Sequence, residues 1–165
     1  MQTRPGISGS RLVVEGRVLD RHGRPIAHAC LDFWHADGHG EYDNEGYNLR
    51  GHQYTDKNGR YLLETVRPSE YMFRAAHIHA KVRVTENSPV LTTQLFFTGE
   101  KKNATDPIFE TLTVMDVADT KDGQKAAFDF VVDVDWCTFP EYLHIGSFLP
   151  ARTQHAEAKS EIIET

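Results

Sequence analysis

Cysteine is scarce in this chain, and long apolar runs and clusters of basic residues are missing. Cys30 and Cys137 are the only two cysteines in 165 residues, too few for a disulfide framework and without the paired spacing of a zinc ribbon. No segment approaches the roughly 20 apolar residues that a membrane-spanning helix needs, and the first residues contain no apolar signal-peptide core. We therefore expect two reduced thiols in a cytoplasmic protein with no membrane partner.

The charge balance also excludes partners. Lysine and arginine total 18 against 24 acidic residues, giving a formal net charge of -6, and no basic run is present. A nucleic acid or an anionic membrane surface is therefore not expected as the main partner. The length favours one domain over residues 1–165, with a core at about 10–135 and a C-terminal extension, 136–165, that ends as a short helix or a frayed tail.

Short β-like segments recur between turn residues, with little helical periodicity, which predicts an all-β fold built as a β-sandwich of two sheets with long surface loops. The expected strands are 11–20, 29–35, 60–66, 76–84, 91–97 and 126–133. Residues 20–25 and 56–59 have the composition of hairpin turns, and 121–124 precede the last strand. Between residues 35 and 53 the chain is rich in Gly, Asp, Asn, His and Tyr, which predicts a surface loop of the kind that carries sites.

The most informative strand is 76–84, because apolar and polar residues alternate along it. The apolar positions are Ala76, Ile78, Ala80, Val82 and Val84, and the polar ones are His77, His79, Lys81 and Arg83. Residues at i and i+2 of a strand project from the same face, so His77 and His79 form a potential metal clamp. The alternative is a pair of solvated surface imidazoles.

Two tyrosines stand near this strand in the sequence. Tyr42 lies in the polar loop, and Tyr71 precedes the histidine strand by a few residues. Taken singly, each is an ordinary packing residue. Zinc and ferrous sites usually combine histidine with carboxylate or cysteine, whereas phenolate ligands suit a harder, more oxidised ion.

Several blocks of the chain together resemble the intradiol ring-cleavage dioxygenases, enzymes that cleave catechols between the two hydroxyl-bearing carbons. The blocks are GRVLDRHGRPI (16–26), WHAD (34–37), GEY (40–42), TDKNGRY (55–61), RAAHIH (74–79) and LTTQLFF (91–97). They occur in the family's order and span most of residues 5–135. The resemblance implies an intradiol dioxygenase-like sandwich with transthyretin-like topology.

The resemblance also implies a cofactor and its ligands. Non-haem Fe(III) would be held by Tyr71 and His77 as axial ligands and by Tyr42 and His79 as equatorial ligands, with a hydroxide completing the set. The substrate would be a catechol, which chelates the iron, displaces Tyr71 and reacts with O2. Both oxygen atoms would enter a cis,cis-muconate-type diacid.

Two further residues match family positions near the substrate. Arg74 would stabilise negative charge that develops on the ring, although taken alone it is typical of a surface arginine paired with an acid. Gln94 would donate a hydrogen bond to a bound oxygen, or alternatively serve as a strand residue that ties down a neighbouring loop.

Other polar and aromatic residues of the matching blocks receive structural interpretations. We expect Trp34 in the core, His35 in a structural role or beside the ligands, and Arg50 with Gly51 in an architectural turn. His39 and His52 flank the site loop and are candidates for substrate contact.

The chain departs from the family in two places. We expect the chain to lack the added N-terminal helical region of catechol-cleaving members, and only Met72 and Phe73 separate Tyr71 from Arg74, where protocatechuate-cleaving members carry an insertion. The short spacing predicts a more open pocket, or one completed by a neighbouring subunit of a homo-oligomer, with a dimer favoured. It leaves the ring substituents of the substrate open.

Two other interpretations compete with this one. The block at 16–26 also occurs in transthyretin-like and carboxypeptidase-regulatory-like sandwiches, so a catalytically inactive aromatic-binding module is one alternative. A zinc or Fe(II) enzyme is the other, with His77, His79 and a carboxylate from Asp37, Asp43 or Glu41 as ligands.

Overall fold

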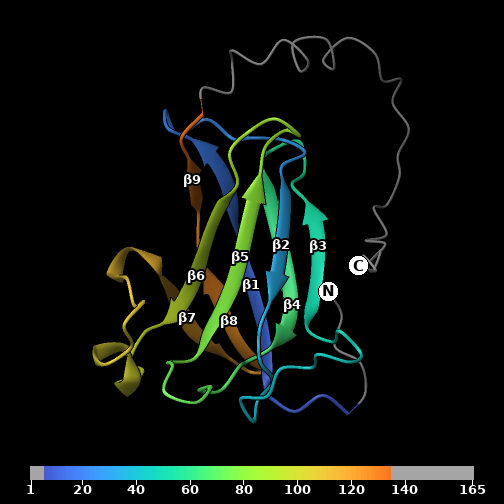
Figure 1. Cartoon of the computed structure of the whole chain (residues 1–165). Coiled ribbons are helices and arrows are strands. Elements are labelled where there is room, and N and C mark those ends of the chain that lie inside the picture. Colours follow the sequence, from blue (N-terminus) through green and yellow to red (C-terminus); the bar gives the residue numbers. More distant parts are fainter. Residues whose placement is uncertain (1–5, 135–165) are drawn as a thin grey trace.

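The computed structural model describes residues 6–134, which fold almost entirely into β-strands joined by loops (Figure 1). The strands are β1 (Arg11–Asp20), β2 (Cys30–Trp34), β3 (Arg50–Tyr54), β4 (Arg60–Val66), β5 (His77–Arg83), β6 (Leu91–Phe97), β7 (Val114–Thr120), β8 (Gly123–Ala127) and β9 (Phe130–Val132). Two short 3-10 helices, η1 (Lys101–Ala104) and η2 (Thr111–Thr113), lie between β6 and β7. Within these described residues, no helix has the length and apolar character needed to span a bilayer.

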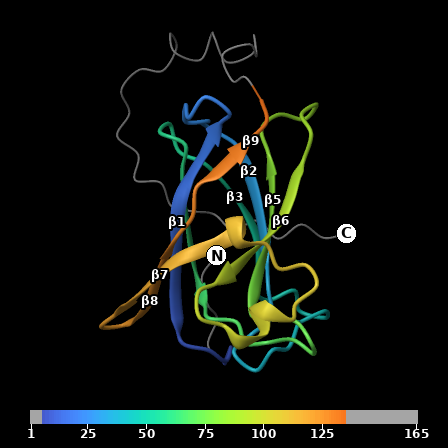
Figure 2. The same cartoon turned by 90° about the vertical axis from the view of Figure 1, so that its left-hand side faces the viewer.

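The strands form two layers that face each other, as Figure 2 shows from the side. One layer has the order β3-β2-β5-β6 and the other the order β7-β8-β1-β4, with β9 beside β1. A short parallel pairing of β6 with β7, Phe96 with Val114 and Phe97 with Met115, joins the layers at one edge. The predicted all-β sandwich is confirmed.

The core fills the space between the layers because one face of each central strand is apolar. On β5 the side chains of Ile78, Ala80 and Val82 are fully buried, while Lys81 and Arg83 are exposed. Alternation along the strand therefore places the apolar residues inside, as the sequence predicts. The polar residues, His77 and His79 among them, belong to the opposite face.

The predicted strand boundaries are accurate where the apolar pattern is strong. The strands at 11–20, 60–66 and 91–97 have the predicted bounds, and those at 29–35 and 76–84 are one residue shorter at each end. The turn at 121–122 joins β7 to β8 as a tight hairpin, with Thr120 opposite Gly123. The expected C-terminal extension, 136–165, which includes Cys137, lies outside the described residues. Cys30 is a free thiol.

One predicted strand, 126–133, is wrong as a single element. It is divided into β8 and β9 because Phe128 and Asp129 turn their polar groups to side-chain and backbone partners outside the ladder. The Phe128 carbonyl accepts a hydrogen bond from the Tyr61 hydroxyl at 2.7 Å, and the Asp129 carboxylate accepts one from the Arg17 N–H at 2.7 Å. The interruption lies against Gly16, where a Cβ atom would overlap the Phe128 carbonyl oxygen.

The turn at 56–59 is present but is not a hairpin. Gly59 N–H donates to the Asp56 carbonyl at 3.0 Å, yet β3 pairs with β2 and β4 pairs with β1. The turn therefore carries the chain from one layer to the other. Strand β3 itself was expected to be mostly loop, because its polar, half-exposed residues have no apolar alternation, and pairing with β2 alone holds it at the sheet edge.

Candidate metal centre

His77 and His79 project from the outer face of β5, as the alternation predicts. His77 is buried at 3% exposure, and its ring packs against Phe96 with the ring centroids 5.9 Å apart. His79 is half-buried and stacks flat on Trp34, with a centroid separation of 4.6 Å and an interplanar angle of 2°. Trp34 was expected in the core. It lies instead on the outer face of β2, because its strand partner is His79 and paired residues share a face.

Tyr42 reaches these histidines from the loop between β2 and β3. The carbonyl of Asp37 accepts from Ser69 N–H at 3.0 Å, which ties the start of this loop to the segment before Tyr71. Gly40 adopts a φ of +81°, and a Cβ atom there would lie 2.1 Å from the Glu70 carbonyl oxygen. Only glycine permits so close an approach. The loop therefore passes directly against the Tyr71 segment.

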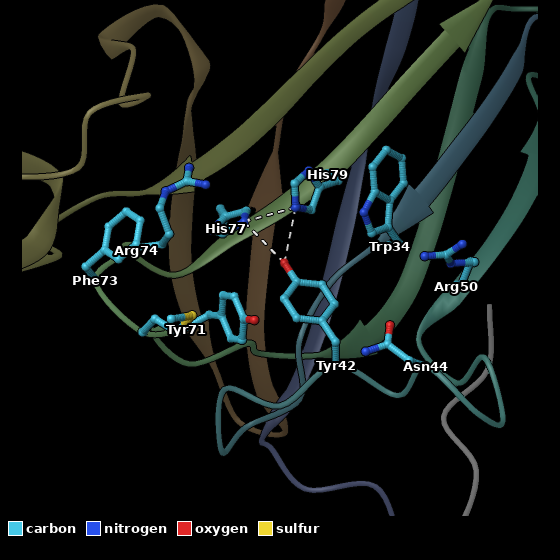
Figure 3. A pocket seen from close by; sticks show the side chains of 10 residues that line it. Trp34, Tyr42, Asn44, Arg50, Tyr71, Phe73, Arg74, His77 and His79 are labelled. Carbon is cyan, nitrogen blue, oxygen red and sulfur yellow. Dashed lines mark hydrogen bonds between the residues drawn. The ribbon is translucent and has the colours of Figure 1, made fainter.

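Three potential ligand atoms converge at one point (Figure 3). The Tyr42 hydroxyl oxygen lies 3.3 Å from His77 Nε2 and 3.1 Å from His79 Nε2, and the two Nε2 atoms are 3.1 Å apart. Ligands bound about 2.0–2.1 Å from one ion are separated by roughly 2.9–3.4 Å in octahedral to tetrahedral arrangements. The three observed separations lie in this interval, so the donor set fits a single cation.

Hydrogen bonding and burial favour neutral imidazoles at this point. His77 Nδ1 donates to the Ala75 carbonyl at 2.7 Å, which leaves the Nε2 lone pair facing Tyr42 and His79. Burial lowers the pKa of His77, and burial followed by the nearby His77 and Arg74 lowers the pKa of His79 to about 4. Burial likewise raises the pKa of the Tyr42 phenol to about 12.

Tyr71 stands beside this cluster without joining its hydrogen bonds. Its ring meets the Tyr42 ring edge to face at a centroid distance of 5.0 Å, and the residue is 38% exposed. A tight turn follows it, in which Arg74 N–H donates to the Tyr71 carbonyl at 2.8 Å and Met72 has a φ of +53°. This turn places Tyr71 and Arg74 on the same wall of the site.

Arg74 is held rigidly by a buried acid, Asp106, whose side chain is 0% exposed. The Arg74 Nε donates to both Asp106 carboxylate oxygens at 2.9 Å, and one Nη donates to the Gln94 side-chain oxygen. Burial opposes ionisation of Asp106, but hydrogen bonds from Ile108 N–H, Arg74 and Ala75 N–H outweigh it and hold the pKa of Asp106 below its ordinary value. Because the Arg74 guanidinium donates both to the ionised Asp106 and to the Gln94 side chain, these two residues together fix its orientation.

Asp106→Asn is expected to lower the free energy of unfolding by about 2–4 kcal/mol. The substitution removes the buried negative charge that pairs with Arg74, and it puts the amide NH2 group where an oxygen accepts hydrogen bonds from N–H groups. Urea denaturation would measure the change. Asp116→Asn, which neutralises an exposed acid on β7, is the matched control. A loss for Asp106→Asn no larger than that of the control would contradict this account of the Arg74 anchor.

The ligand cluster opens into a cavity of about 420 Å³. Its lining residues are Trp34, Tyr42, Asn44, Arg50, Tyr71, Met72, Phe73, Arg74, His77 and His79. Arg50 was expected in an architectural turn, but it begins β3 and lines this cavity. Two of these lining residues, Met72 and Phe73, are exposed.

Neither histidine proposed to flank the site lines the cavity. His52 lies in a separate groove with Cys30 and Tyr54, and His39 is exposed in the loop. His35 has the expected structural role, since its buried ring bonds the Ala36 carbonyl at 2.7 Å and the Thr65 hydroxyl at 2.8 Å.

Two of the carboxylates named in the zinc or ferrous alternative, Asp37 and Asp43, accept hydrogen bonds from backbone N–H groups of the loop. Asp37 accepts from the His39 and Glu41 N–H groups, and Asp43 accepts from Gly46 and Asn48. Between residues 6 and 134, no group of three or more His, Cys, Asp or Glu side chains could hold a metal ion. A facial triad with Asp37, Asp43 or Glu41 is therefore wrong.

Sequence reasoning missed Asp106, the cavity role of Arg50, and Asn44. Asp106 lies 32 residues after Arg74 in a polar segment that follows η1, and no spacing rule connects them. Arg50 offered one usable signal: in a strand over residues 50–54 it would project from the same face as His52 and Tyr54.

Comparisons with known proteins point to one enzyme family. The family model described as Dioxygenase matches residues 2–139. The protocatechuate 3,4-dioxygenase beta chain of Burkholderia cepacia is 32% identical over 119 residues, covering 62% of this chain and 51% of that protein. The hydroxyquinol 1,2-dioxygenase of Rhizobium sp. (strain MTP-10005) is 30% identical over 145 residues, covering 72% and 48%. The chain thus spans about half the length of these curated relatives.

Solved structures show the same fold. The dioxygenase domain of a dioxygenase carbohydrate-binding fusion from Streptomyces sp. SirexAA-E has a TM-score of 0.77 at 41% identity, over 81% of this chain and 86% of that one. The 3-chlorocatechol 1,2-dioxygenase of Rhodococcus opacus 1CP has a TM-score of 0.71 at 29% identity, over 79% and 62%. With the family model matching most of its length, the chain belongs to the intradiol ring-cleavage dioxygenase family.

Proposed function

We propose that this protein is a non-haem Fe(III)-dependent intradiol dioxygenase, which opens a catechol-type ring between its hydroxylated carbons with O2 and yields a cis,cis-muconate-type diacid. The observation that carries the proposal is the convergence of Tyr42 Oη, His77 Nε2 and His79 Nε2 within 3.1–3.3 Å. Tyr71 is the proposed fourth ligand. Two phenol oxygens with two imidazoles favour the oxidised ion, because phenolates are hard, anionic donors. We expect the working form to be a homo-oligomer, with a dimer favoured.

The bound Fe(III) would supply a Lewis acid that lowers the pKa of both catechol hydroxyls and leaves an electron-rich ring to react with O2. Tyr71 would accept one of these protons; its exposed ring lines the cavity beside Tyr42. The stacked Trp34 and His79 rings form one wall of the cavity.

Arg74 contributes charge stabilisation without having to reorganise. Its guanidinium is already oriented by Asp106 and Gln94 before substrate arrives. A preorganised cation stabilises negative charge on the ring carbons as it develops, and it acts most strongly where water is excluded. Gln94 acts through Arg74 in this scheme.

Ring opening under oxygen tests the proposal directly. Iron-loaded protein would be incubated with catechol, protocatechuate, hydroxyquinol, pyrogallol and substituted catechols while O2 uptake and product mass are recorded. We expect a diacid that retains both atoms of ¹⁸O2 from at least one substrate, and none after iron is removed by a chelator. Binding of these catechols without O2 uptake would support the inactive aromatic-binding module and overturn the proposal.

Tyr71→Phe is expected to leave the fold intact, since its hydroxyl makes no hydrogen bond within the described residues, while changing the tyrosinate-to-iron absorption and slowing turnover about 100-fold, the lower end of the effect of losing a proton acceptor. Circular dichroism, the visible spectrum and steady-state rates are the measurements. An unchanged spectrum and rate would remove Tyr71 from the proposed ligand set.

A further inference from the structure

The cavity contains an arginine whose charge is not neutralised. Arg74 and Arg50 are its two cations, and none of its lining residues is acidic. Arg74 is paired with the buried carboxylate of Asp106. Arg50 forms no ion pair with an acid anywhere in residues 6–134. The cavity therefore presents net positive charge on the Arg50 side.

Strand pairing determines where this charge lies. Trp34 on β2 is the Cα partner of both Arg50 on β3 and His79 on β5, so the three side chains form one row across the outer face. The Arg50 guanidinium lies 6.0 Å from the Trp34 ring centroid, within the range of cation–π attraction. Trp34 in turn stacks on His79. The row thus places Arg50 two strands away from His79 on the same face of the sheet.

The two arginines flank the ligand cluster from opposite sides (Figure 3). Arg74 lies with Phe73 on one side of His77 and Tyr42, and Arg50 lies with Asn44 and Trp34 on the other. Lys81 has its Nζ 5.6 Å from the Trp34 ring centroid, but both Lys81 and its Cα partner Asp32 line the separate groove and neither lines this cavity.

We propose that Arg50 binds an anionic substituent, a carboxylate in the simplest case, on the ring of a catechol held at the metal centre. This inference rests on the proposed function and names the substrate class of that site. A guanidinium fork matches a carboxylate with two parallel hydrogen bonds, which an ammonium cannot do. Contact with the Trp34 ring reduces the rotamer freedom that Arg50 loses on binding. Asn44 provides a neutral hydrogen-bond donor on the same side.

The test compares two ligands of similar shape that differ in charge. Dissociation constants for 3,4-dihydroxybenzoate and 3,4-dihydroxybenzamide would be measured calorimetrically on the iron-loaded protein without O2, so that no turnover occurs. We expect the carboxylate to bind about tenfold tighter, the scale of a charged hydrogen bond that is partly screened by solvent. The preference should shrink as salt is added.

Variants assign this preference to one residue. Arg50→Gln should bring the ratio of the carboxylate and carboxamide affinities to about one. Arg50→Lys should keep only part of the preference for the carboxylate, because the charge remains but the guanidinium fork is lost. Arg83→Gln is the control, since it removes the same charge from the same outer face in the other groove. Its ratio should equal that of the wild type.

Three outcomes would overturn the inference: a wild-type ratio near one, an unchanged ratio in Arg50→Gln, or an equal loss in Arg83→Gln. Ring opening separates this inference from the function on which it rests. If catechol is opened but the carboxylate and the carboxamide bind equally tightly, the dioxygenase activity stands and the anion subsite is wrong. If the affinity ratios are as predicted but no catechol is opened, the anion subsite stands and the proposed dioxygenase activity is wrong.

Discussion

The Tyr42→Phe variant is expected to lose most of its bound iron, its visible colour and more than about 100-fold in kcat/KM, which exceeds the usual effect of residues that only orient a ligand. The substitution removes one oxygen atom from the point where Tyr42, His77 and His79 meet. The ring, and its contact with Tyr71, are retained. Iron per chain, the visible spectrum and ring-opening rates are the measurements.

Tyr54→Phe is the matched control for Tyr42→Phe, because it deletes the same atom from a tyrosine of β3 that lies outside the cavity. It should retain iron and activity. Iron content and turnover that survive in Tyr42→Phe as they do in Tyr54→Phe would show that the three converging atoms are a hydrogen-bond cluster and not a metal centre.

Arg74→Gln is expected to keep its iron and lose about 10²–10³-fold in kcat, the range found when one preorganised electrostatic group is removed from an active site. Arg74 touches none of the three converging ligand atoms, but it lines the same cavity with its guanidinium fixed by Asp106 and Gln94. The metal should therefore survive while charge stabilisation is lost. Single-turnover rates with iron analysis would separate the two effects.

The same substitution leaves Asp106 buried without its partner, so stability must be measured alongside activity. Arg74→Lys is the second variant, since it retains a positive charge near Asp106 and should preserve the fold better. Its turnover should remain slow, because lysine lacks the planar guanidinium group. Arg83→Gln controls for loss of an exposed cation. A folded, iron-bound Arg74 variant with the wild-type kcat would exclude Arg74 from the chemistry.

The sequence was sufficient for elements whose information is local. The alternation along 76–84 predicted both the strand and the shared face of His77 and His79, because side chains of a strand alternate with a period of two whatever its neighbours are. Tyr42 and Tyr71 could be named only through the family resemblance. The structure brings the two rings within 5.0 Å of each other, although no local rule joins residues 29 positions apart.

Local patterns failed where a distant partner decides the conformation. Residues 126–133 have the apolar character of one strand, but the Tyr61 hydroxyl and Arg17 divide it. Residues 50–54 have the composition of a loop, but β2 pairs with them. Hydrogen bonds between residues far apart in sequence produce no periodic pattern in the sequence, so they cannot be predicted from β-propensity alone.

Residue order by itself therefore determined the β class, most strand positions and the face on which two imidazoles project, since each follows from alternation within a few residues. Only the tertiary structure decided that Asp106 anchors Arg74 and that Arg50, Trp34 and His79 form a row across three strands. Those arrangements depend on register and loop packing, which are set by the whole sheet and by burial of charge.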